Sequence, residues 1–108
     1  MDASAADEAI ERAGRALIDA VPAPAKVILF GSRAAGGADE QSDFDFLVIE
    51  REVDDRFAEM ARLGRLLGRM LVPADVVVVS ERDASKWGPV KGTLVYEALS
   101  RGRVLAES

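Results

Sequence analysis

The stretch GSRAAGGADEQSDFDFLV, residues 31–48, decides how the rest of the chain is interpreted. It starts with a Gly–Ser pair directly after the apolar residues 27–30, and two aspartates, Asp43 and Asp45, stand at the start of a second apolar run. Glycine permits unusual backbone angles and leaves room for a phosphate beside the main chain. A phosphate-binding turn next to paired carboxylates is what a metal-dependent nucleotide site requires.

The spacing of the aspartates supports a metal site. On a strand, Asp43 and Asp45 leave the same face with their Cα atoms roughly 6.5–7 Å apart, and two catalytic metal ions lie about 3.5–4 Å apart. Both carboxylates can therefore bind both ions. Asp75 precedes four consecutive valines, and it can face the pair if its strand lies beside theirs. An aspartate at a strand start is, in isolation, more often a turn residue.

The composition narrows the chemistry further. The 108 residues include no histidine and no cysteine, which excludes imidazole catalysis, Ser-His-Asp triads and thiolate metal sites. Any metal should be a hard cation with oxygen ligands. The net charge of −5 argues against direct binding of nucleic acid. We expect no membrane span, because no apolar run approaches 18 residues, and a cytoplasmic location, because no signal peptide is visible.

The chain is expected to form a single domain, residues 1–108, of the α/β (α+β) class: a small mixed β-sheet with helices packed on it. Apolar periodicity and proline positions predict elements in the order α-β-β-α-β-α, with a short final strand. The expected helices cover residues 4–20, 54–71 and 89–101, and the expected strands cover residues 26–30, 43–49, 74–79 and 104–105. Asp54 or Asp55 can cap the second helix.

Other acidic or phosphate-binding motifs fit less well. Asp39, Asp43 and Asp45 do not form an EF-hand, because the central glycine and terminal glutamate are missing. A phosphatase would carry its Asp-x-Asp pair after the first strand, where this chain has Gly–Ser. No Gly-Lys-Ser/Thr follows the loop, so it is not a P-loop.

The combination of strand, Gly31-Ser32, ten intervening residues and Asp43-Phe44-Asp45 resembles the DNA polymerase β-type nucleotidyltransferase superfamily. In length the chain resembles the minimal nucleotidyltransferases, antitoxin partners of HEPN toxins. The resemblance spans residues 21–105 and implies the polymerase β-like fold. One departure is Ala35, where small members of the family often carry a basic residue.

The resemblance implies the residues of the site. The catalytic and metal-binding set would be Asp43, Asp45 and Asp75, holding two Mg²⁺ ions, or Mn²⁺ in their place. The nucleotide, ATP, would contact the loop that follows the first strand. The expected contacts are Gly31, Ser32, Arg33 and Ser42, with Arg33 standing in for the basic residue missing at Ala35.

The resemblance also implies a function: a Mg-dependent protein adenylyltransferase that moves AMP from ATP to a hydroxyl, a tyrosine of the cognate HEPN toxin, as the antitoxin of a type VII-like pair. Two alternatives stay open, a catalytically idle antitoxin that masks the toxin and a small-molecule, antibiotic-type nucleotidyltransferase. Either homo- or hetero-oligomers are compatible with the sequence. Arg62, Arg65 and Arg69 share one helix face, which is either solvated or a docking surface.

Overall fold

The computed structural model describes residues 3–31 and 44–108. These residues form four helices and four strands, one helix more than the apolar periodicity predicts. Their order is α1 (Ala3–Asp19), β1 (Ala25–Phe30), β2 (Phe44–Glu50), α2 (Arg56–Arg69), β3 (Ala74–Ser80), α3 (Glu81–Trp87), α4 (Leu94–Arg101) and β4 (Arg103–Glu107). None of the helices in these residues is long and apolar enough to cross a lipid bilayer.

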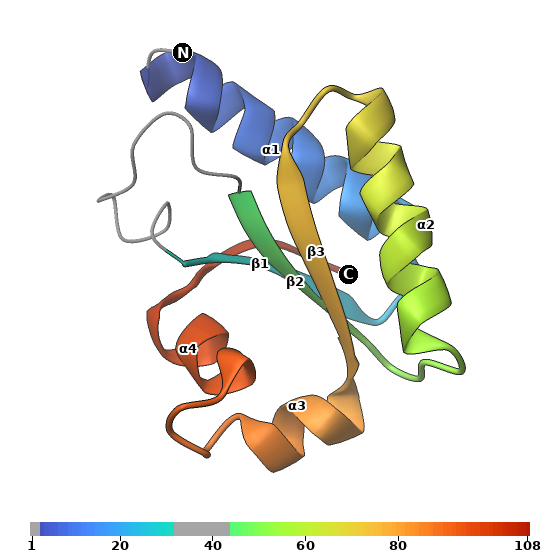
Figure 1. Cartoon of the computed structure of the whole chain (residues 1–108), viewed down its shortest axis with the longest axis vertical. Coiled ribbons are helices and arrows are strands. Elements are labelled where there is room, and N and C mark those ends of the chain that lie inside the picture. The colour runs from blue at the N-terminus through green and yellow to red at the C-terminus, as the bar shows by residue number, and fades with distance from the viewer. Residues whose placement is uncertain (1–2, 32–43) are drawn as a thin grey trace.

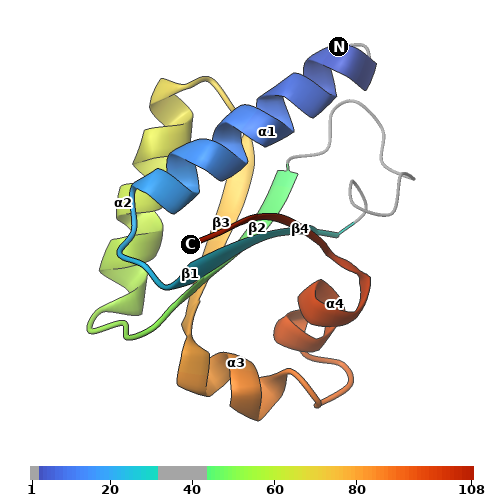
Figure 2. The same cartoon turned by 180° about the vertical axis from the view of Figure 1, so that it is seen from behind.

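The four strands form one mixed sheet in the order β3-β2-β1-β4. Strand β1 pairs antiparallel with β2 and β4, whereas β2 and β3 run parallel. Helices α1 and α2 cover one face of the sheet, and α3 and α4 cover the other (Figures 1 and 2). The predicted α+β class and mixed sheet are confirmed.

The alternation of side chains along β2 builds two cores. Phe44, Phe46 and Val48 pack with α1 and α2, while Leu47 and Ile49 pack with α3 and α4. The valines of β3 divide in the same way: Val76 and Val78 belong to the first core, and Val77 and Val79 contact the second. The interpretation of this run as a strand covered on both faces is confirmed.

Local capping motifs mark both ends of α2. Helix α2 starts after Asp55, whose carboxylate accepts a hydrogen bond from the Ala58 backbone N–H at 3.0 Å. It ends in a Schellman motif, in which the Leu71 N–H donates to Gly68 O and the Val72 N–H donates to Leu67 O, both at 3.0 Å. The expected helices at 4–20 and 54–71 are correct to within two residues.

The expected helix at 89–101 is wrong at its start, and the preceding helix, α3, is missing from the sequence-based prediction. Helix α4 starts after Thr93, which caps it by accepting from the Tyr96 N–H at 3.1 Å. Pro89 lies in the turn before α4 instead of in its first turn. Helix α3 starts without a loop, because Ser80 at the end of β3 accepts from the Asp83 N–H at 3.1 Å. The Ser-x-x-Asp pattern of residues 80–83 is the sequence signal that could have predicted the start of α3.

Candidate functional site

The fold brings two of the three proposed catalytic aspartates together. Strands β2 and β3 are neighbours, and Asp45 is paired in register with Asp75. Paired residues on adjacent strands lie about 4.8 Å apart and point to the same face. That face carries α3 and α4, because Leu47 and Val77, two residues further along each strand, pack there. Asp45 is partly buried and Asp75 is exposed.

Gly31 adjoins the same position from β1. It follows Phe30, the register partner of Asp45, and its φ of 83° lies in the left-handed region that side chains disfavour. A Cβ atom at Gly31 would lie 2.5 Å from Asp45 Oδ2. The space that a side chain would fill is thus occupied by the Asp45 carboxylate, so the glycine accommodates the acid as well as the turn.

The remaining predicted contacts, Ser32, Arg33, Ser42 and Asp43, lie outside the described residues. Within residues 3–31 and 44–108, no three acidic side chains are close enough together to hold a metal ion. Asp45 and Asp75 supply two of the three predicted ligands. Carboxylate oxygens suit Mg²⁺ or Mn²⁺, and the aligned pair beside the Cβ-free turn fits such an ion. The roles of these residues stay predictions.

A second acidic cluster lies at the other end of β2, and the sequence analysis missed it. Glu50 ends the strand on the α1/α2 face and is 5% exposed. Its Oε2 atom is buried and has no hydrogen-bond donor among the described residues. Burial, followed by a hydrogen bond with Glu59 and the charge of Glu59, raises the pKa of Glu50 from 4.5 to about 7. The signal was available, since Glu50 continues the inward alternation of Phe44, Phe46 and Val48.

Arg62 balances the charge of this cluster within the chain. Its Nε donates to Glu59 Oε1 at 2.6 Å and its Nη2 donates to Glu59 Oε2 at 2.9 Å. The hydrogen bond with Arg62 lowers the pKa of Glu59. Arg62 Nη2 also donates to the Ala20 carbonyl at 2.9 Å, which joins α2 to the end of α1. Arg62 therefore has a structural role as well as an exposed surface, and the docking face of Arg62, Arg65 and Arg69 stays a prediction.

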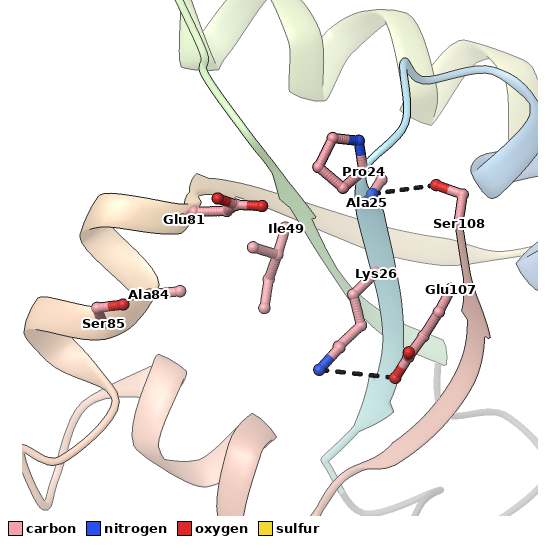
Figure 3. A pocket seen from close by; sticks show the side chains of 9 residues that line it. All are labelled: Pro24, Ala25, Lys26, Ile49, Glu81, Ala84, Ser85, Glu107 and Ser108. Carbon is pink, nitrogen blue, oxygen red and sulfur yellow. Dashed lines mark hydrogen bonds and ion pairs between the residues drawn. The ribbon is translucent and has the colours of Figure 1, made fainter.

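A cavity of about 420 Å³ lies at the end of the sheet where β1 starts, away from Asp45 and Asp75. Figure 3 shows Lys26 of β1 and Glu107 of β4 pointing toward one another beside it, with 3.6 Å between Lys26 Nζ and Glu107 Oε1. The Ala25 N–H donates to the Ser108 hydroxyl at 3.0 Å. These polar groups pair with one another and hold β4 against β1.

Comparisons with solved structures support the fold. A toxin–antitoxin structure with AMP-PNP superimposes with a TM-score of 0.60 at 24% identity, covering 94% of this chain and 73% of that one. A mutant toxin–antitoxin complex of MntA and HpeT gives a TM-score of 0.60 at 20% identity, covering 91% and 73%.

A third structure contains the tri-AMPylated HEPN toxin of Shewanella oneidensis in complex with its MNT antitoxin. It superimposes with a TM-score of 0.52 at 18% identity, covering 91% of this chain and 72% of that one. No curated protein matches the sequence. Residues 10–103 match the nucleotidyltransferase domain family, so the resemblance seen in the sequence is confirmed at that level: this chain belongs to the nucleotidyltransferase domain family.

Proposed function

We propose that this protein is a minimal nucleotidyltransferase antitoxin that transfers AMP from ATP to a tyrosine hydroxyl of a HEPN-type toxin. The observation that carries the proposal is the register pairing of Asp45 with Asp75 next to Gly31, on a nucleotidyltransferase domain. Two similar structures, one with AMP-PNP and one with an AMPylated HEPN toxin, support ATP as the substrate and a HEPN toxin as the partner.

Two Mg²⁺ ions would be held by Asp43, Asp45 and Asp75, and when bound they offset the charge that builds up at the α-phosphate and on the departing pyrophosphate. The Ser32 hydroxyl and the backbone at Gly31 would hold the outer phosphates. In the transfer, the tyrosine oxygen bonds to the α-phosphorus, the bond to the pyrophosphate breaks, and the phenolic proton goes to solvent.

The pairing of β2 with β3 supports a site whose carboxylates are in place before substrate binds. Asp45 packs against Gly31, and hydrogen-bonded pairing fixes β2 beside β3, so the two acids keep their separation. Preorganised charges of this kind lower the barrier to transfer because they need no rearrangement in the transition state. The lack of cysteine fits action in the reducing cytoplasm.

The test is transfer to the cognate toxin. The purified protein, MgATP and the HEPN toxin should yield toxin that carries AMP on tyrosine, detected by mass spectrometry, with loss of its ribonuclease activity. Toxin that is silenced by complex formation but stays unmodified would contradict transfer and support the masking role. Modification of an aminoglycoside in place of the toxin would support the small-molecule alternative.

A further inference from the structure

A small pocket beside the aspartate pair has no role in the function proposed above. It encloses about 160 Å³ and lies between β3, α3 and the start of α4. Its apolar lining includes Val77 and Val79 of β3, Trp87 of α3 and Leu94 of α4. Trp87 and Leu94 are 42% and 41% exposed, which is high for large apolar side chains at the edge of a core.

The pocket and the candidate site share strand β3. Val77 lies two residues beyond Asp75 and points to the same sheet face, so their Cα atoms are roughly 6.5–7 Å apart. A nucleotide whose phosphates are held at Asp45 and Asp75 has a ribose and a base that extend over such a distance. The pocket lining at Val77 therefore lies where the base of a bound nucleotide can reach.

The chemistry of the pocket suits a flat ring with polar edges. Aliphatic side chains and the Trp87 ring offer stacking surfaces, and aromatic stacking does not depend on base identity. Arg56 and Asp83 also line the pocket, and they offer a hydrogen-bond donor and an acceptor to the edge of a base. Lys86 Nζ lies 5.1 Å from the Trp87 ring centroid, which orients the indole by a cation–π contact.

The backbone around Trp87 is held in place. The Trp87 carbonyl accepts from the Val90 N–H at 2.9 Å and from the Thr93 hydroxyl at 3.1 Å. These bonds tie the end of α3 to the cap of α4, so that Trp87 and Leu94 keep their positions on either side of the pocket. A preformed pocket binds a ring at a lower entropic cost than a mobile one.

From these observations we infer that the pocket formed by Val77, Val79, Trp87 and Leu94 binds the purine base of the nucleotide substrate. The inference rests on the proposed function, because it assumes that a nucleoside triphosphate binds at Asp45 and Asp75. It assigns to Trp87 and Leu94 the affinity for the base, separate from the affinity for the phosphates.

Trp87 is the single tryptophan of the chain, so its fluorescence reports on this pocket alone. Calorimetry and fluorescence should be measured together, with MgATP and with Mg-tripolyphosphate, which has no base. Both ligands should bind, and only ATP should quench Trp87 with the calorimetric dissociation constant. Leu94→Arg should weaken ATP binding by about 5- to 100-fold, the range of base–aromatic stacking, and leave tripolyphosphate binding unchanged.

Leu99→Arg is the matched control, because Leu99 is equally exposed on α4 at 43% but does not line the pocket. ATP binding without quenching, equal quenching by tripolyphosphate, or wild-type ATP affinity in Leu94→Arg would each overturn the pocket while the proposed function stands. The absence of binding heat with both ligands would overturn the proposed function and this inference together.

Discussion

The two ends of β2 carry acidic clusters of opposite character. At the start of the strand, Asp45 is aligned with Asp75, which is exposed, on the α3/α4 face. At its end, Glu50 is buried on the α1/α2 face and adjoins Glu59, whose charge Arg62 balances. In the second cluster, burial raises the pKa of Glu50, Arg62 binds Glu59, and solvent cannot reach Glu50 Oε2. In the first, solvent reaches Asp75.

The two ends show how a ligand-binding site differs from a cluster of acidic residues that stabilises the fold. Burial raises the pKa of Glu50, whereas the hydrogen bond with Arg62 lowers the pKa of Glu59. Arg62 also connects Glu59 to the end of α1. Next to Asp45, by contrast, stands Gly31, which has no Cβ atom, and the Asp45 carboxylate occupies the space that a Cβ would need. Burial with an internal counter-ion indicates stability, whereas aligned acids beside a Cβ-free turn indicate ligand binding.

The largest expected effect separates the two ends by activity. Asp45→Asn and Asp75→Asn should each lower AMP transfer to the toxin by at least about 10³-fold, because each removes charge that acts in the transition state. Transfer rates in single-turnover assays measure this, with circular dichroism to confirm folding. Glu50→Gln is the control at the other end of β2 and should keep its rate within about threefold of wild type. A comparable loss in Glu50→Gln would mean that the two ends are not independent.

The next effect is a pH dependence confined to the buried end. Because the pKa of Glu50 is about 7 in the folded protein, the native state binds more protons than the unfolded chain between pH 4.5 and 7. The contribution of Glu50 to stability is therefore complete below pH 4.5 and falls as the pH rises to 7. Glu50→Gln should match wild type near pH 5 and exceed it by up to about 3 kcal/mol at pH 8.

Urea unfolding across this pH range measures the difference between the two proteins. Glu52→Gln provides the control, because Glu52 lies two residues after Glu50 but is exposed, and its effect should be small at every pH. A difference in unfolding free energy between Glu50→Gln and wild type that stays constant from pH 5 to 8 would contradict the raised pKa of Glu50.

Gly31→Ala tests the contact at the other end. A side chain at a φ of 83° costs roughly 1–2 kcal/mol of unfolding free energy, and the added Cβ must displace the Asp45 carboxylate. Both stability and ATP affinity should fall, as urea unfolding and calorimetry would show. Gly64→Ala in α2, where the added Cβ meets no atom within 4 Å, should instead stabilise by about 0.5–1 kcal/mol. Unchanged ATP affinity in Gly31→Ala would show that Asp45 does not need this space.

The smallest effect concerns neither end of β2. Leu71 follows α2 with a φ of 61° and is 89% exposed, at the position of the Schellman motif where glycine is favoured. Leu71→Gly should raise the free energy of unfolding by about 0.5–1 kcal/mol, since it relieves backbone strain and loses little burial. A decrease would show that the exposed leucine contributes packing.

Sequence reasoning recovered the parts of the fold that local patterns determine. The valine run of β3, the Asp55 cap and the alternation of β2 all follow from residue type and spacing. The same alternation placed Asp45 and Asp75 on one face once the two strands were neighbours, and the structure shows that they are. That pairing is a long-range choice, which the sequence allowed but did not require.

Three features of the structure were not predicted from the sequence, each for a physical reason. Helix α3 follows β3 without a loop, so no turn residues marked its start, and Ser80, just after the expected strand at 74–79, was not recognised as a cap. The inward position of Glu50 follows from the alternation along β2, but its contact with Glu59 of α2 is a long-range one that no local pattern encodes. Arg62, grouped with Arg65 and Arg69 by helical spacing, is exposed as they are but also binds Glu59 and the Ala20 carbonyl. Spacing identifies a shared helix face but not what covers each part of it.

The central claim, that the Asp45 end of β2 holds a metal-dependent nucleotide site, is tested most directly by the linkage between Mg²⁺ and ATP. Calorimetry should show that Mg²⁺ strengthens ATP binding by at least about tenfold in wild type and in Glu50→Gln. Asp45→Asn and Asp75→Asn should lose most of this gain. Equal ATP affinity with and without Mg²⁺ in the wild-type protein, or an undiminished gain in both aspartate variants, would contradict the claim.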